Sequence, residues 1–117
     1  MSKIDEFNSY REKMNRKILK DANLGIKRFF ALDTQTYASG TLSSKVKELL
    51  GLVASLVLRC NDCITYHILQ CHDLGVSKEE FYETFNVALI VGGSIVIPHL
   101  RKAVDILEEC YSKDNYQ

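Results

Sequence analysis

The sequence predicts an all-α protein, a single helical domain of about five to six helices, and three observations favour this fold class. The 117 residues include one Pro and six Gly, so long stretches contain no helix breaker. Apolar residues recur at steps of three and four, which is the spacing of one face of an α-helix. The one compact β-branched cluster, residues 95–97, has no partner strand in the chain. We therefore expect one domain over residues 1–117.

The N-terminal part, residues 3–40, predicts two helices. In residues 3–20, apolar side chains alternate with charged ones at helical spacing, which predicts an amphipathic helix. A second helix is predicted over residues 26–38, and Gly40 is expected to end it as a C-cap.

A central helix is predicted next. Residues 41–44 include hydroxyl side chains that can accept hydrogen bonds from the first N–H groups of a helix. Residues 49–58 are apolar on nearly all sides, so this helix should be buried. Because the apolar surface of residues 46–58 and 84–97 exceeds what a few short helices can cover, we also expect a subunit interface.

The remaining elements are bounded by short local signals. Gly75 ends the helix that follows the central one. Ser77 and Glu80 have the spacing of a capping box, which predicts a helix start at about residue 78. Residues 92–94, Gly-Gly-Ser, interrupt that helix, and Pro98 suits the first turn of the last one.

The bulk composition excludes several functional classes. The formal net charge is zero, so the chain lacks the basic footprint of a nucleic-acid-binding protein. The longest apolar runs fall well short of the roughly 20 residues that span a bilayer, and the first residues do not resemble a signal peptide. We therefore expect a cytoplasmic protein that binds neither nucleic acid nor membrane, with its four cysteines not forming a structural disulfide framework.

The segment from Cys60 to His67 carries the densest reactive chemistry. Two cysteines separated by two residues can close a disulfide across one helical turn. If Asn61 or Asp62 capped a helix here, Cys63 would lie in its first turn, where the N-terminus favours a thiolate. His67 lies four residues after Cys63, hence on the same helix face, and can exchange a proton with it.

Glu48 can join this site only if the chain turns. On one straight helix, Glu48 and His67 would be separated by 19 residues, about 28 Å. A turn near residues 58–61 would make the two helices antiparallel and bring the side chains to similar depths. We expect Glu48 and His67 to lie within one bridging water of each other.

A metal site is the rival chemistry of the segment. Cys60 and Cys71 are eleven residues apart, about 16 Å on one helix, whereas zinc ligands lie about 2.0–2.3 Å from the ion. One ion therefore cannot bind all the ligands of this helix, and a closed site would need His99 or Cys110 from another element. We expect no metal and no cofactor.

Five segments together form a known pattern: Leu42–Ser43, Lys47–Leu49, Cys60–His67, Gly75–Glu80 and Gly92–Gly93. Its most specific part is a Glu twelve residues before the motif CxxCxxxH. The core motif region, residues 42–93, therefore resembles the carboxymuconolactone decarboxylase superfamily in its alkylhydroperoxidase D-like branch. The N-terminal helices within residues 3–40 add little to this match.

The resemblance implies an all-helical homo-oligomer, a trimer or hexamer, that acts as an antioxidant thiol peroxidase or disulfide oxidoreductase. Its substrates would be a hydroperoxide and a lipoamide- or thioredoxin-like dithiol. It implies that Cys63 is the peroxidatic thiol, that Cys60 resolves it, and that Glu48 and His67 form a proton relay. Members often carry a second histidine where this chain has Asp62, whose negative charge disfavours a thiolate at Cys63.

Two alternatives remain at this point. The superfamily resemblance also allows a decarboxylase-like lyase that uses Glu48 and His67 without thiol redox chemistry. The other alternative is a non-enzymatic helical oligomer in which Cys60 and Cys63 form a redox sensor.

Overall fold

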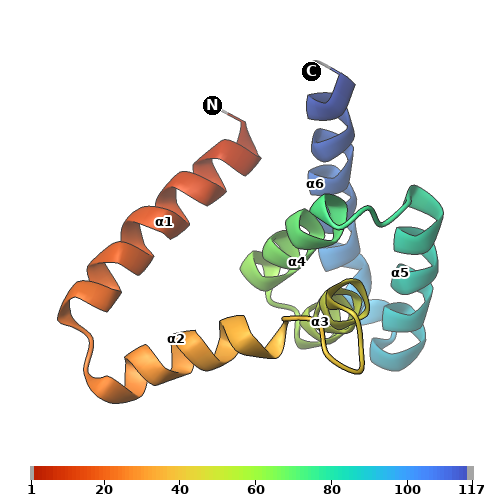
Figure 1. Cartoon of the computed structure of the whole chain (residues 1–117). Helices are drawn as coiled ribbons and strands as arrows, with labels where there is room; N and C mark the ends of the chain where they lie inside the picture. Colours follow the sequence, from red (N-terminus) through yellow and green to blue (C-terminus); the bar gives the residue numbers. More distant parts are fainter. Residues whose placement is uncertain (1, 116–117) are drawn as a thin grey trace. The chain divides into compact units, whose positions relative to one another are not determined.

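The computed structural model describes residues 2–115, and every regular element within them is helical (Figure 1). The all-α prediction is confirmed. The elements are α1 (Lys3–Asp21), α2 (Leu24–Thr36), α3 (Ser44–Leu58), α4 (Asn61–Asp73), α5 (Lys78–Gly92), the short 3₁₀-helix η1 (Ser94–Val96) and α6 (Ile97–Asn115). None of the helices in this described part is long and apolar enough to cross a membrane.

The chain divides into two compact units, residues 1–38 and residues 39–117. The first unit contains α1 and α2, and the second contains all the other helices. The expectation of a single domain over residues 1–117 stays a prediction.

In the first unit, both helices begin at a polar cap. The Asn23 side chain accepts a hydrogen bond from the backbone N–H of Ile26 and so starts α2. The predicted C-cap at Gly40 is wrong, because α2 ends at Thr36 with Tyr37 as its cap. Gly40 instead donates its N–H to the carbonyl of Leu42, in the loop that leads to α3.

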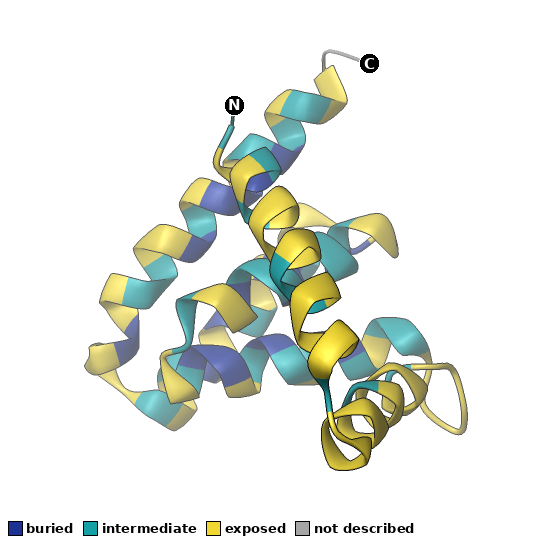
Figure 2. Cartoon of the chain, turned by 90° about the vertical axis from the view of Figure 1, so that its left-hand side faces the viewer, coloured by how far each residue is buried: buried dark blue, intermediate teal, exposed yellow. Residues whose placement is uncertain are grey.

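The core of the second unit lies where α3 contacts α4 and α5, and where α4 contacts α6. Dark blue segments in Figure 2 mark the buried positions along these helices. The largest fully buried side chains are Phe81, Leu52, Leu56, Ile64, Ile68, Leu107, Val96 and Cys71. Residues 49–58 are less buried than predicted: Leu50 is 56% exposed and Leu58 is 77% exposed. One face of α3 is therefore apolar and exposed.

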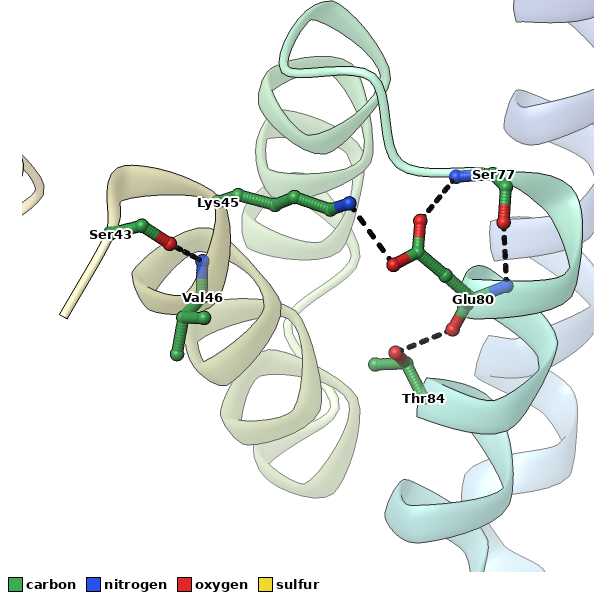
Figure 3. Close-up of polar contacts among 6 residues, drawn as sticks. All are labelled: Ser43, Lys45, Val46, Ser77, Glu80 and Thr84. Atoms are coloured by element: carbon green, nitrogen blue, oxygen red, sulfur yellow. Dashed lines mark hydrogen bonds and ion pairs between the residues drawn. The ribbon is translucent and has the colours of Figure 1, made fainter.

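The predicted capping box is present at the start of α5 (Figure 3). Ser77 Oγ accepts from the backbone N–H of Glu80, and the Glu80 carboxylate accepts from the N–H of Ser77. Lys45 Nζ, from the first turn of α3, lies 3.0 Å from Glu80 Oε2. The Ser77 N–H and the Lys45 ammonium hold the pKa of Glu80 below its usual value. The same carboxylate thus starts α5 and links it to α3.

The predicted interruption after α5 is confirmed. Gly93 has a positive φ of 80° that ends the helix, and η1 follows directly. A Cβ on Gly92 would lie 2.5 Å from Val96 Cγ2 and 3.4 Å from Val57 Cγ2. The glycine therefore allows α5, η1 and the end of α3 to pack closely.

Candidate functional site

A tight turn between α3 and α4 creates the site. Arg59 adopts the left-handed conformation (φ 60°, ψ 40°), which reverses the chain. Its N–H donates to the carbonyl of Leu56, and the N–H of Cys60 donates to that of Ser55. The turn lies where it was predicted, but Arg59 makes it, at a position where Gly is the usual residue.

The two cysteines of the motif lie at the start of α4. The predicted cap at Asn61 or Asp62 is wrong, because Cys60 is the N-cap: its Sγ lies 3.3 Å from the backbone N of Cys63 and accepts its N–H. Cys63 lies in the first turn, as expected. The pair forms a disulfide, with the two Cα atoms 5.3 Å apart. Cys60 is half-buried and Cys63 is exposed, so the Cys63 side chain is open to a reagent from solvent.

A buried hydrogen bond joins α3 to α4 one turn beyond the cysteines. Glu48 Oε2 lies 2.7 Å from His67 Nδ1, and both side chains are almost completely buried. The expected proximity of these residues is confirmed, as direct contact without a bridging water. Because a carboxylate oxygen accepts, His67 Nδ1 donates the hydrogen of this bond and Nε2 is the nitrogen that does not face Glu48.

Gly51 makes room for the histidine ring. A Cβ at this position would lie 2.6 Å from Cε1, 2.8 Å from Nε2 and 2.9 Å from Nδ1 of His67. Gly51 lies three residues after Glu48, so both residues are on the face of α3 that meets α4. Gly51 was not among the predicted site residues, although a glycine in the middle of an apolar helix was a usable signal.

A second imidazole reaches the cysteine motif from α6. His99 Nδ1 lies 2.8 Å from Oδ1 of Asn61, the first residue of α4. In sequence, His99 was only a possible ligand of a zinc site. The contact spans 38 residues, and no local pattern could have predicted it.

The other two cysteines are placed as core residues. Burial raises the pKa of Cys71 to about 12, with a further contribution from the charge of Glu48. Burial likewise raises the pKa of Cys110 to about 11. His72 Nε2, further along α4, lies 2.7 Å from Asp114 Oδ2 of α6. Residues 2–115 contain no group of three or more His, Cys, Asp or Glu side chains arranged to hold a metal ion.

Comparison with known proteins supplies a family for this arrangement. The model of the carboxymuconolactone decarboxylase family matches residues 26–106. The chain belongs to this family. The match includes Glu48, Gly51 and the whole cysteine motif.

The family relationship is also visible in solved structures. A crystal structure of a Thermotoga maritima protein shares 51% sequence identity with the chain, covers 96% of it and 98% of its own length, and gives a TM-score of 0.93. A second crystal structure of the same protein, at 50% identity, covers 95% and 94% of the two chains with a TM-score of 0.91. It is described as a carboxymuconolactone decarboxylase family protein and as a candidate for involvement in antioxidative response.

More distant relatives extend the comparison. A family member from Legionella pneumophila, at 24% identity, covers 94% of this chain and 98% of its own with a TM-score of 0.85, which supports the fold alone. A Paracoccus denitrificans protein, named uncharacterized protein 4 in cox locus, is 28% identical over 81 residues, or 69% of this chain and 73% of that protein. The catalytic roles of Glu48, Cys60, Cys63 and His67 stay predictions.

The packing of His67 against Gly51 predicts a specific steric cost. Gly51→Ala should lower the free energy of unfolding by about 1–3 kcal/mol, because the new methyl group displaces the imidazole. Denaturant unfolding measures this change. Gly25→Ala is the matched control, since its Cβ would meet only Asn23 Oδ1 at an ordinary 3.5 Å. Gly51→Ala should cost less in a His67→Ala background, and equal stability of the two Gly→Ala variants would contradict the assignment.

The raised pKa values predict selective thiol reactivity. At pH 8 only about one in 10,000 Cys71 side chains and one in 1,000 Cys110 side chains would be thiolate, so both should react slowly. After reduction, the native protein should show two fast thiols, Cys60 and Cys63, in a chromogenic thiol assay. All four should react in denaturant, and Cys63→Ser should remove one fast thiol. A third fast thiol in the native protein would show that the buried cysteines are accessible.

Proposed function

We propose that this carboxymuconolactone decarboxylase family protein is a thiol-dependent peroxidase, or a closely related disulfide oxidoreductase, with an antioxidant role. Cys63 would be the peroxidatic thiol and Cys60 the resolving thiol. Glu48 and His67 would move protons. The observation that carries the proposal is the Cys60–Cys63 disulfide at the start of α4, one turn from the buried Glu48–His67 pair.

The local surroundings of the cysteines support these assignments. Cys63 is exposed and has a helix N-terminus beside it, which favours a thiolate. His67 follows Cys63 by four residues, and the Glu48 carboxylate fixes its ring and tautomer. The description of the Thermotoga maritima relative, with its reference to antioxidative response, agrees with this chemistry.

In the oxidative half of the cycle, the Cys63 thiolate would attack the terminal oxygen of a hydroperoxide. The O–O bond breaks, Cys63 becomes a sulfenic acid, and the departing alkoxide leaves as an alcohol with the proton that His67 had taken from the Cys63 thiol. The Cys60 thiol then attacks the Cys63 sulfur and releases water. The peroxide gains two electrons, and the cysteine pair loses two.

In the reductive half, an external dithiol would restore the pair. One thiolate of the donor attacks a sulfur of the disulfide to give a mixed disulfide, and the second donor thiol displaces the protein thiolate. The donor leaves as a disulfide, and Cys60 and Cys63 return to the dithiol state. A lipoamide- or thioredoxin-like donor carries the two thiols that this step requires.

Assembly into a homo-oligomer is part of the same proposal. Exposed apolar side chains gather on the second half of α5, where Ile90 is 88% exposed and Val91 is 65% exposed. The adjacent end of α3 adds Leu58, since Gly92 of α5 lies against Val57. An apolar surface of this kind is typical of an interface between copies of one chain, in a trimer or a hexamer.

Peroxide consumption tests the catalytic proposal. With an alkyl hydroperoxide and reduced lipoamide or thioredoxin, the wild type should consume peroxide, whereas Cys63→Ser should fall to the rate without protein. Cys60→Ser, reduced beforehand and assayed without a donor, should consume about one equivalent per chain and stop at the sulfenic acid. Glu48→Gln should slow turnover by about 10²–10⁴-fold, the usual contribution of a positioned proton-transfer group.

Cys110→Ala is the matched control, because it removes a buried cysteine outside the motif and should keep the wild-type rate. A wild type no faster than Cys63→Ser would refute the peroxidase. Turnover of a lactone acid that survives Cys60→Ser together with Cys63→Ser would favour the lyase instead. Reversible loss of two thiols without turnover would favour a redox sensor.

The mass in solution tests the assembly. Light scattering after size exclusion should give three or six times the chain mass of 13.3 kDa. Ile90→Glu should lower this mass, because the interface would have to bury an unpaired charge. Glu83→Gln, an exposed change on the same helix, should leave it unchanged. A monomeric wild type at micromolar concentration would refute the oligomer.

A further inference from the structure

The residue that follows the first cysteine is held from two directions. Asn61 is the first residue of α4, and its backbone carbonyl accepts from the Thr65 hydroxyl at 3.0 Å. Its side-chain Oδ1 lies 2.8 Å from His99 Nδ1. Since the amide oxygen accepts, the His99 imidazole donates the hydrogen. The Thr65 bond lies within α4, but the His99 bond ties the start of α4 to α6.

The start of a helix is where this tie has the largest effect. The first N–H groups of α4 have no partner within the helix, so its first turn is prone to fray. In the disulfide form, Cys60 and Cys63 span this turn with their Cα atoms 5.3 Å apart. Once the disulfide is reduced, only the weaker contacts of the turn keep the sulfurs near each other. A frayed turn separates the thiols and makes the disulfide harder to form again.

We propose that His99 is a positioning residue for the cysteine pair, acting through its hydrogen bond to Asn61. It holds the first turn of α4 in the conformation that the disulfide requires, and so raises the effective concentration of one thiol at the other. This role rests on the proposed function only in treating Cys60 and Cys63 as the redox pair. His99 itself touches Asn61 and is not assigned a proton-transfer step.

The consequence is a shift in the equilibrium between dithiol and disulfide. A single hydrogen bond of this kind makes a modest net contribution, so its loss should favour the dithiol by about three- to tenfold. A tenfold change corresponds to about 30 mV in the potential of a two-electron couple. The potential of the pair should therefore become less negative when the contact is removed.

The chain offers a matched control for this contact. His72 is also half-buried on the α4–α6 interface, with Nε2 2.7 Å from Asp114 Oδ2. This bond lies near the other end of α4, a full helix length from the cysteines. Loss of either imidazole contact weakens the docking of α4 on α6, but only the His99 contact holds the turn that carries the disulfide.

The experiment equilibrates the full chain with glutathione redox buffers and counts dithiol and disulfide by alkylation and mass spectrometry. His99→Phe should favour the dithiol by about three- to tenfold. His99→Gln keeps an amide N–H that can donate to Asn61 and should recover most of the wild-type equilibrium constant. Asn61→Ala, which removes the acceptor, should reproduce the His99→Phe shift, and the double variant should shift no further. His72→Phe should keep the wild-type constant.

Two results would overturn the proposal. An unchanged equilibrium constant in Asn61→Ala would do so, and this variant keeps the test valid if His99→Phe fails to fold. Equal shifts in His99→Phe and His72→Phe would show that the effect comes from weaker packing of α4 on α6 in general, and not from the turn that carries the disulfide. The readout uses no peroxide, so a failed peroxidase assay leaves this measurement intact and the two hypotheses are judged separately.

Discussion

The hydrogen bond between Glu48 and His67 is the constraint on which the second unit of this chain depends. Each side chain is almost fully buried, and an ionisable group in that position is costly without a partner. The bond can form only if α3 and α4 are antiparallel and in one register. The left-handed turn at Arg59 reverses the chain, and the absence of a side chain at Gly51 leaves room for the His67 ring. Both features allow that register. The Glu48–His67 pair, which resembles a catalytic proton relay, therefore also specifies how α3 and α4 pack.

That packing sorts the four cysteines into two chemical classes. The turn places Cys60 and Cys63 at the end of a helix, next to solvent and to backbone N–H groups. Cys71 lies on the same helix two turns further on, where burial and the Glu48 charge keep it a neutral thiol. The carboxylate that orients His67 thus also suppresses the reactivity of the neighbouring buried thiol. The fold itself therefore separates a disulfide-bonded pair at the start of α4 from two buried free thiols.

The sequence predicted what depends on local spacing. Helix periodicity, the Ser77–Glu80 capping box and the alignment of His67 with Cys63 involve residues within a few turns of each other, and all are present. Gly40 was predicted to be the C-cap of the second helix because glycine often ends helices. Instead, α2 ends at Thr36 and Tyr37 is its C-cap. The face of α3 that includes Leu50 and Leu58 was expected to be buried, but composition cannot say which apolar face another helix covers. Tertiary contacts decide such cases.

The contact between His99 and Asn61, which the sequence could not predict, shows how the motif CxxCxxxH is held in place. Glu48 reaches α4 from the preceding helix, and the contact was inferred on the condition that the chain turns near residues 58–61. His99 reaches Asn61 from α6, after two intervening elements whose geometry no spacing rule supplies. Two helices, α3 and α6, therefore converge on the first two turns of α4. The motif CxxCxxxH is only the segment of the site that is continuous in sequence, and the contacts that hold it come from α3 and α6. A chain with the same motif but without these contacts would present the same two thiols on a less ordered turn.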